Sequence, residues 1–328
     1  EAEAADRVLQ LSRLFFALRR DEKLALSNSV HQFFRYRGLL VPASGPGYRA
    51  VAADANFSSD LRESFNIGWA VEEQEEKGSQ ELAGIGDGSG DVPYGPTPWP
   101  AETSIQGFRE ACEHYAALLV RRSVQLRRCL ALSLELPVDF FDAPGLFDRA
   151  PWLLGMVHYL PIASDVQGKT YGIAPHQDDG IFTLLHTDGS PGLQICPGWT
   201  GSGVHREASM LDPSLEWVDV EAVPGHWVVN LGTLLTRWSN GRFKATLHRV
   251  VLGEAAGDRY SVPFFYEANL DARVGCLPGC EHVDSRKVGA STTGDLQHTG
   301  LPAVTPGEVL LEMAQRDGLQ LIPQSSLS

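Results

Sequence analysis

The sequence predicts an α+β protein with a mainly β core, in which a double-stranded β-helix (jelly roll) is flanked by helices. From Trp152 onwards, about eight short apolar runs rich in β-branched and aromatic residues are separated by Gly, Pro, Asp or Asn. No helical pattern lies between these runs, which favours two antiparallel sheets over parallel βαβ units. Amphipathic helical patterns occupy the chain before Trp152. The predicted strands lie in residues 152–160, 171–178, 181–188, 193–197, 216–223, 226–232, 247–253 and 259–268.

The N-terminal third is expected to be helical. Residues 5–26 predict an amphipathic helix, because apolar side chains recur every three or four positions. These side chains are Val8, Leu11, Phe15 and Leu18. The Gly/Pro-rich residues 45–50 interrupt the pattern, and we expect residues 60–68 to form a short structured turn. Residues 103–136 predict a long helix with Thr103 as its N-cap.

Residues 72–100 form an insert that is first acidic, then rich in glycine and finally rich in proline. This composition is typical of a surface segment without a core of its own. We expect residues 1–150, with this insert, to be a helical N-terminal region that belongs to the same fold as the β-rich residues 151–328. A last short helix is expected at residues 307–318.

Composition limits the kinds of partner. The chain has 328 residues and a formal net charge of −14, and an acidic chain without a Lys/Arg-rich patch argues against binding to nucleic acid. Neither a signal peptide nor a membrane-spanning run is recognisable, so we expect a cytoplasmic protein. The five cysteines are scattered, which argues against a disulfide framework. Residues 276–282 (CLPGCEH) are only a weak zinc motif.

Residues 174–189 (APHQDDGIFTLLHTDG) carry the strongest chemical signal. His176 and Asp178 lie two positions apart in a β-rich run, and residues i and i+2 of a strand face the same side. An imidazole and a carboxylate aimed at one point suit Fe(II), Zn(II) or Mn(II), and two histidines with one carboxylate are typical of non-haem Fe(II) oxygenases. A third ligand must come from elsewhere in the chain. The histidines considered for it are His158, His186 and His226, in predicted strands, and His248.

His248 is favoured because a second polar pair follows it closely. Arg259 and Ser261 are again spaced i and i+2, and a hairpin through residues 253–258 would place them beside the strand that carries His248. The fork of donors on arginine, with a serine hydroxyl on the same face, is suited to bind a carboxylate. The sequence therefore predicts a metal and, nearby, a carboxylate-bearing molecule.

With these motifs in view, the sequence resembles the Fe(II)/2-oxoglutarate-dependent oxygenases of the isopenicillin N synthase-like family. The resemblance rests on residues 176–178 (HQD), 230–250 and 259–265 (RYSVPFF), in their order, spacing and flanking residues. It covers most of the chain, with further matches at residues 15–23, 47–48, 60–68 and 96–100. In this family a strand and a helix–strand unit normally precede the segment that residues 15–23 match.

The resemblance implies a set of cofactors and the residues that hold them. The implied ligands of Fe(II) are His176, Asp178 and His248, and the implied contacts of the cosubstrate 2-oxoglutarate are Arg259, Ser261 and Tyr159. With O2 as the oxidant, such an enzyme hydroxylates, desaturates or cyclises a small organic metabolite and releases succinate and CO2. The substrate is therefore expected to be a small molecule.

Several points stay open from the sequence alone. Phe182 and Phe265 are candidates for lining the substrate cavity, with core packing as the alternative for each. Thr233 stands where relatives commonly carry an acidic residue, and we expect it to touch no ligand. Two other functions fit the motifs: an oxidase of the isopenicillin N synthase type, whose Arg-x-Ser pair binds a substrate carboxylate, and a metal-binding relative without turnover. A zinc hydrolase is disfavoured, because no carboxylate placed as a general base accompanies the site. Neither the substrate nor the oligomeric state follows from the sequence.

Overall fold

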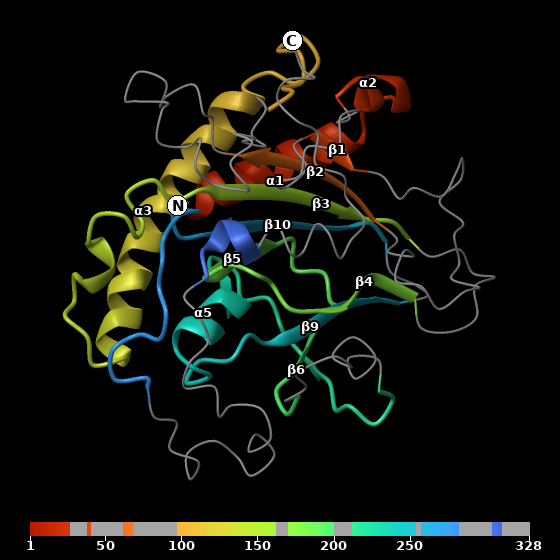
Figure 1. The fold of residues 1–328 in the computed structure, drawn as a ribbon. Coiled ribbons are helices and arrows are strands. Elements are labelled where there is room, and N and C mark those ends of the chain that lie inside the picture. The colour runs from red at the N-terminus through yellow and green to blue at the C-terminus, as the bar shows by residue number, and fades with distance from the viewer. Residues whose placement is uncertain are drawn as a thin grey trace.

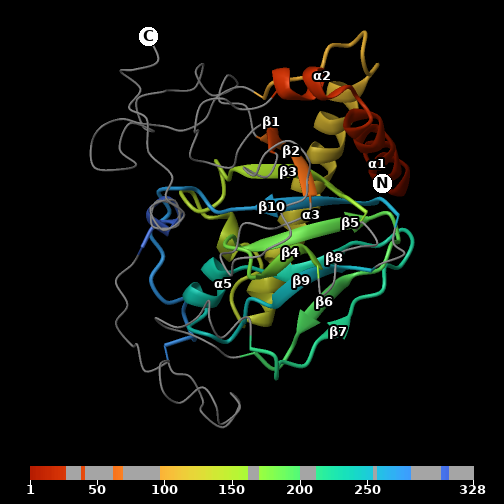
Figure 2. The ribbon, with the colours of Figure 1, turned by 90° about the vertical axis from the view of Figure 1, so that its right-hand side faces the viewer.

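The strands form two antiparallel sheets that lie face to face (Figures 1 and 2). The computed structural model describes residues 1–26, 38–40, 62–68, 97–161, 170–199, 212–253, 257–281 and 304–309. The predictions for residues 45–50, for most of 72–100 and for most of the helix at 307–318 lie outside the described residues.

Each sheet mixes strands from distant parts of the chain. The larger, six-stranded sheet has the order β1 (Gly38–Leu40), β2 (Arg62–Gly68), β3 (Trp152–Tyr159), β10 (Arg259–Tyr266), β5 (Phe182–Thr187) and β8 (Val228–Leu231). The smaller, four-stranded sheet has the order β4 (Thr170–His176), β9 (Leu247–Leu252), β6 (Leu193–Cys196) and β7 (Val218–Asp219). All strand neighbours in both sheets are antiparallel, so the described core is a mainly antiparallel β structure with few helices.

Helices cover one face of the larger sheet. The helical elements are α1 (Ala2–Phe16), α2 (Arg20–Ala25), α3 (Phe108–Ser133), the short 3₁₀ helix η4 (Phe140–Asp142) and α5 (Thr233–Trp238). Helix α1 contacts α3, β3 and β10, and α3 also contacts β10. In the part of the chain that the structure describes, no helix combines the length and the apolar character needed to cross a membrane.

The larger sheet separates two cores of unequal size. Its outer face packs with α1 and α3 in the main core, where Phe15, Phe108 and Phe264 are fully or almost fully buried. Its inner face meets the smaller sheet in a much smaller cluster, which includes Val157 of β3 and Val250 of β9. Since successive strand residues point to opposite faces, neighbours on β10 serve different cores. The space between the sheets therefore holds only a small apolar cluster beside the polar side chains of the inner face.

The N-terminal region differs from its prediction in three places. The predicted helix 5–26 ends at Phe16 and resumes as α2 at Arg20. Residues 60–68, expected to form a turn, supply strand β2, which pairs with β3 and extends the larger sheet. The long helix begins at Phe108 with Gly107 as N-cap at φ 70°, instead of at Thr103, because residues 101–107 form turns. Gly107 can adopt this left-handed conformation because glycine has no Cβ, whereas the conformation is unfavourable for residues with a side chain.

The predicted hairpin between His248 and Arg259 is also wrong. Strand β9 pairs with β4 and β6 in the smaller sheet, whereas β10 pairs with β3 and β5 in the larger one. The connection between β9 and β10 therefore crosses from one sheet to the other. Both strands still line the space between the sheets, so the two motifs reach the same interior from opposite walls.

Candidate functional site

Three potential metal ligands converge between the sheets. His176 ends β4 and lies in register with His248 on the neighbouring strand β9, and their ring centroids are 4.2 Å apart. Asp178 follows two residues later, beyond the end of the strand. Its Oδ1 lies 3.7 Å from Nε2 of His176 and 3.6 Å from Nε2 of His248. Within the described ranges this is the one group of three or more His, Cys, Asp or Glu side chains close enough to share a metal ion.

The two imidazoles are oriented in the same way. Nδ1 of His176 lies 2.9 Å from the carbonyl oxygen of Ala174, and Nδ1 of His248 lies 2.9 Å from that of Thr246. A carbonyl only accepts hydrogen bonds, so each Nδ1 donates, and in the neutral ring each Nε2 then carries a lone pair. Such a contact fixes both the tautomer and the ring orientation of a ligating histidine. Both lone pairs face the carboxylate of Asp178.

Asp178 is itself held by two donors. Its Oδ2 accepts hydrogen bonds from Oγ1 of Thr183 at 2.5 Å and from Nδ2 of Asn230 at 2.7 Å, which leaves Oδ1 turned to the imidazoles. Burial by itself would raise the pKa of Asp178, but His248, His176 and the two hydrogen bonds outweigh it and lower the pKa. The carboxylate therefore stays ionised, as a metal ligand must be.

The electrostatics also keep His176 neutral. Burial lowers the pKa of His176 well below its ordinary value of 6.5, and the neighbouring His248 lowers it further, against the opposing effect of Asp178. The side chain of His176 is nevertheless 35% exposed, whereas that of His248 is 13% exposed. The cluster thus combines the neutral imidazole of His176 with an ionised carboxylate, and His176 is still accessible to an incoming ion.

The loop that carries Asp178 is fixed by the start of α5. The backbone N–H of Thr233 donates to the carbonyl oxygen of Asp178 at 2.8 Å, and that of Leu234 to Asp179 at 2.9 Å. A Cβ added to Gly232 would lie 2.0 Å from the carbonyl oxygen of Gly180, so only glycine fits there. The side chain of Thr233 donates to the carbonyl oxygen of Asp179 at 3.2 Å, and only its backbone N–H reaches Asp178.

A second polar group lies on the inner face of the larger sheet. Arg259 is 2% exposed, and its Nε and Nη1 have no hydrogen-bond partner among the residues that the structure describes. Its guanidinium carbon lies 4.7 Å from the ring centroid of Tyr159, with which it is in register. Ser261 is buried two residues further along the same strand, and its hydroxyl donates to the Tyr159 hydroxyl at 3.3 Å. The predicted trio therefore comes together as a buried cationic receptor.

Tyr159 also connects the receptor to the smaller sheet. Its ring lies against Gly172 of β4, where an added Cβ would be 2.5 Å from Cδ1 of the tyrosine. It belongs to the same inner cluster as Val250, which lies two residues after His248 on β9. The metal-ligand candidates and the cationic receptor therefore occupy opposite walls of one interior.

The other site candidates point elsewhere. Phe182, a candidate for the substrate cavity, is buried in the main core and stacks on Tyr266 with ring centroids 5.3 Å apart. It therefore faces the helices, and the cavity assignment is wrong for it. Phe265 is half-buried and lies two and four positions from Pro263 and Ser261, so strand alternation places it on the inner face.

The other three histidines considered as a third ligand do not join the cluster. His158 and His186 lie opposite Tyr260 and Val262 of β10 in register, and Val262 belongs to the main core on the outer face. His226 was expected in a strand, but β8 begins at Val228. The structure thus leaves His248 as the third member, in agreement with the sequence.

Thr183 and Asn230 were missed by the sequence reasoning. A buried carboxylate requires hydrogen-bond donors, so their existence was foreseeable. Their identity was not, because Asn230 is 52 residues from Asp178 along the chain and meets it only when β8 pairs with β5.

Comparison with known proteins gives a consistent picture. The sequence model of the 2OG-Fe(II) oxygenase superfamily matches residues 153–268. The 2-oxoglutarate-Fe(II) type oxidoreductase hxnY of Emericella nidulans is 33% identical over 276 residues, which are 84% of this chain and 69% of that protein. Kihadalactone A synthase LFS of Citrus sinensis is 33% identical over 285 residues, 86% of this chain and 75% of that protein.

Solved structures share the fold. A full-length protein of Neurospora crassa, solved in complex with alpha-KG, superposes with a TM-score of 0.71 at 23% identity, covering 97% of this chain and 84% of that chain. JOX2, solved in complex with 2OG, Fe and JA, superposes with a TM-score of 0.64 at 20% identity, covering 99% of this chain and 76% of that chain.

Proposed function

Because this chain belongs to the 2OG-Fe(II) oxygenase superfamily, we propose that His176, Asp178 and His248 are its Fe(II) ligands and that Arg259, Ser261 and Tyr159 bind 2-oxoglutarate. The enzyme is a 2-oxoglutarate- and Fe(II)-dependent dioxygenase that uses O2 to oxidise a small organic molecule. The assignment of these side chains to their roles is what the proposal adds.

The donor set fits Fe(II). Two imidazole nitrogens and one carboxylate oxygen on one side of a site are the facial triad of non-haem Fe(II) oxygenases. The geometry suits a metal, since each Nδ1 is bonded to a backbone carbonyl, which leaves each Nε2 turned to the ionised carboxylate of Asp178. Thr183 and Asn230 restrain the carboxylate from behind, as partners of metal ligands commonly do.

The single observation that supports the cosubstrate assignment most strongly is Arg259. A buried guanidinium with two unpartnered nitrogens is costly unless an anion compensates it. A carboxylate matches the fork of donors, and 2-oxoglutarate carries one at each end. Ser261, on the same face, adds a hydroxyl.

The protein's own contribution is to bind and orient. Fe(II), when bound, supplies the redox chemistry that couples decarboxylation of 2-oxoglutarate to oxidation of the substrate by O2. Arg259 and Ser261 would hold the far carboxylate of the cosubstrate, so that its other end is directed to the metal ligands across the interior. Phe265, on the inner face of β10, would restrict the space left for the substrate.

The two stacked antiparallel sheets support the finer fold assignment. We propose that they are the two sheets of a jelly roll, whose interior holds the site. The interleaved strand orders, with β4 and β9 in one sheet and β3, β5 and β10 in the other, fit this topology.

Calorimetric titration of the Fe(II)-loaded protein with 2-oxoglutarate, in the absence of O2, tests the assignment. Arg259→Met keeps much of the side-chain volume but removes the charge, and we expect the Kd to rise about 10- to 100-fold, as for loss of hydrogen bonds to a charged group. Metal content should stay unchanged. Arg149→Met, which removes an arginine paired with Asp271, is the matched control and should leave the Kd unchanged.

A second variant separates the metal from the cosubstrate. His248→Ala should abolish stoichiometric Fe(II) binding in protein that remains folded by circular dichroism. Unaltered 2-oxoglutarate affinity in Arg259→Met, or full metal content in His248→Ala, would contradict the corresponding half of the proposal.

A further inference from the structure

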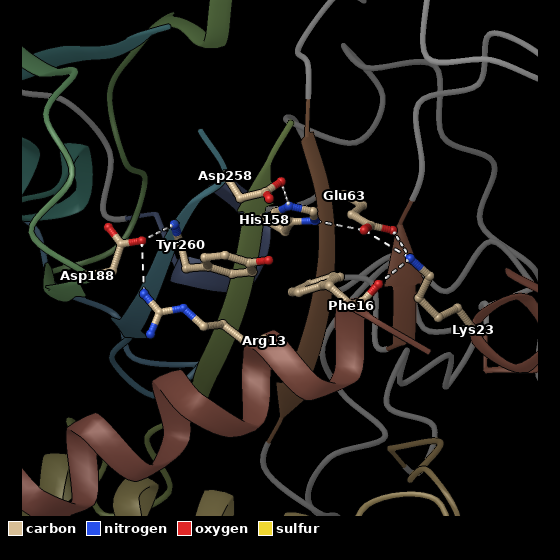
Figure 3. Close-up of polar contacts among 8 residues, drawn as sticks. All are labelled: Arg13, Phe16, Lys23, Glu63, His158, Asp188, Asp258 and Tyr260. Carbon is tan, nitrogen blue, oxygen red and sulfur yellow. Dashed lines mark hydrogen bonds and ion pairs between the residues drawn. The ribbon is translucent and has the colours of Figure 1, made fainter. Parts of the chain in front are cut away.

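A chain of charged side chains lies on the outer face of the larger sheet (Figure 3). We call Lys23, Glu63, His158 and Asp258 the His158 network. Nζ of Lys23, on α2, contacts both carboxylate oxygens of Glu63, on β2, at 3.0 and 2.8 Å, and donates to the carbonyl oxygen of Phe16 at 2.9 Å. Lys23, Glu63 and His158 are buried, whereas the side chain of Asp258 is 54% exposed. The proposed iron chemistry makes no use of these side chains.

His158 lies between two carboxylates. Its Nδ1 is 2.9 Å from Oε1 of Glu63, and its Nε2 is 2.7 Å from Oδ1 of Asp258. A carboxylate oxygen accepts hydrogen bonds, so both ring nitrogens must donate, and only the protonated imidazolium has two N–H groups. With His158 protonated, Lys23 and His158 balance Glu63 and Asp258. With His158 neutral, one nitrogen lone pair would face a carboxylate oxygen and the network would carry one excess negative charge.

The groups around His158 hold it in this geometry. Its ring stacks on Tyr260 of β10, with centroids 4.6 Å apart and planes 4° apart, and the ring of Phe16 lies 5.4 Å away. Arg13 of α1 lies 5.2 Å from the Tyr260 ring centroid and contacts Asp188 at 3.3 Å. Oδ2 of Asp188 also accepts the backbone N–H of Tyr260 at 2.9 Å. Figure 3 shows Arg13 and Asp188 on one side of Tyr260, with His158, Asp258 and Glu63 on the other.

The network is attached directly to the cationic receptor. His158 immediately precedes Tyr159, and Asp258 immediately precedes Arg259. In the antiparallel ladder Arg259 is opposite Tyr159, and Tyr260 is opposite His158. The bond between His158 and Asp258 thus fastens the ends of β3 and β10 on the outer face, at the level where Tyr159 and Arg259 point to the inner face.

Building on the proposed function, we propose that His158 is a positioning residue for the cosubstrate: as an imidazolium bridging Glu63 and Asp258, it holds Arg259 and Tyr159 in the geometry that binds 2-oxoglutarate. Loss of the proton on His158 breaks one of its two bonds and loosens the start of β10. Affinity for 2-oxoglutarate is therefore highest where His158 is protonated and falls as the pH rises through its titration.

The charged groups facing His158 determine this sign. Glu63 from β2 and Asp258 from the β9–β10 connection favour the proton, while Lys23 from α2 and Arg13 from α1 are cations compensated by Glu63 and Asp188. Tyr260 contributes a neutral ring. The change in affinity with pH is assigned to the imidazole, because both of its ring nitrogens contact carboxylate oxygens and the two contacts together need its proton.

Asp258→Asn is the most informative variant, because the side chain is half-exposed and its loss leaves the buried ion pair of Lys23 and Glu63 intact. Asp271→Asn is the matched control: Asp271 also contacts a cationic side chain, Arg149, at 2.7 Å and is 42% exposed. The Kd for 2-oxoglutarate is measured by calorimetry on the Fe(II)-saturated protein, without O2, from about pH 6 to pH 8.5.

Three results are expected together. Asp258→Asn weakens 2-oxoglutarate binding on the order of 5- to 10-fold at the acidic end and flattens its pH dependence, as for a coupling between neighbouring sites. Asp271→Asn matches the wild type throughout. The third result comes from NMR of protein labelled with ¹⁵N-histidine, in which the His158 resonances are those that His158→Gln removes. They should show both ring nitrogens protonated at the acidic end of the pH range, and they should shift in Asp258→Asn. If His158→Gln does not fold, the shift in Asp258→Asn assigns the His158 resonances instead.

Different outcomes separate this inference from the assignment on which it rests. Wild-type protein that binds Fe(II) but no 2-oxoglutarate at any pH would overturn both. Wild-type protein that binds 2-oxoglutarate normally, with Asp258→Asn indistinguishable from Asp271→Asn or with His158 neutral at the acidic end, would overturn only the role of His158.

Discussion

The two faces of the larger sheet differ in how completely their side chains are paired. On the outer face, aromatic side chains pack into the main core, and the charged residues there, such as Lys23 and Glu63, satisfy one another. On the inner face the apolar cluster is small, and Arg259 keeps two nitrogens without a hydrogen-bond partner among the described residues. The imidazoles of His176 and His248 face this side from the smaller sheet. Alternate positions along the strands of the larger sheet therefore have different roles: outward-facing side chains stabilise the core, and inward-facing ones form the candidate site.

Adjacent phenylalanines on β10 provide the largest expected contrast. Phe264 is completely buried in the main core, whereas Phe265 is half-buried on the inner face. Phe264→Ala should lower the free energy of unfolding by about 3–5 kcal/mol, the usual cost of such a cavity. Phe265→Ala should cost clearly less and act mainly on substrate affinity. Urea unfolding of both variants measures the difference, and equal losses of stability would remove the distinction between the faces.

A smaller effect is expected at Thr183, which contacts the proposed metal ligand Asp178. Thr183→Val removes the hydroxyl that donates to Oδ2 of Asp178 at 2.5 Å while keeping the side-chain shape. Loss of such a partner typically costs about 10- to 100-fold in metal affinity, and the global stability should change little by comparison with Phe264→Ala. The matched control is Thr187→Val, four residues along the same strand and bonded to the backbone of Gly189. Competition with a chelator measures the affinities, and identical values for the two variants would contradict the prediction.

The smallest effect is a pH dependence that is weaker than two ordinary histidines would give. The pKa of His176 is lowered, so its imidazole stays neutral to lower pH than the ordinary value of 6.5 would allow. Protons then compete with the metal for His176 only in acid. Mn(II) affinity should therefore fall clearly less than the roughly 100-fold loss expected between about pH 7.5 and pH 5.5 for two imidazoles of ordinary pKa. A loss of about 100-fold over that range in calorimetric titrations would show that the lowered pKa of His176 does not govern the site.

The sequence predicted much of the β core but not its connections. Alternating and β-branched runs located β3, β5, β6, β9 and β10, because these signals are local. Which strands pair is set by long-range packing, and for this reason the predicted β9–β10 hairpin was wrong although Arg259 still faces the interior. Residues 60–68 were expected to form a turn, but most of them form strand β2. Its pairing with β3 places the buried Glu63 opposite His158, and Lys23 of α2 supplies the second partner.

The site itself was more predictable than its supports. Two short motifs could be recognised in the sequence: His176 and Asp178, spaced two residues apart, and the Arg-x-Ser pair at 259–261. Each consists of two or three neighbouring residues, so no knowledge of the fold is needed to find it. The strand that motivated the first pair nevertheless ends at His176, so Asp178 owes its orientation to Thr183, Asn230 and the start of α5 rather than to strand alternation. Hydroxyl and amide side chains of this kind occur throughout any chain, and nothing local marks the few that will meet a buried carboxylate.

The crossing of the chain between the two sheets has a consequence for synthesis on the ribosome. His176 and Asp178 emerge early, but His248 follows 70 residues after Asp178 (248 − 178), and Arg259 only after the chain has passed to the opposite sheet. Helix α1 precedes β3 and β10 along the chain and can bury its apolar face only once both have been synthesised. Non-local pairings of this kind form slowly, and intermediates expose the unpaired strand edges. Capture of iron is thus expected to follow the synthesis of β9 and its pairing with β4.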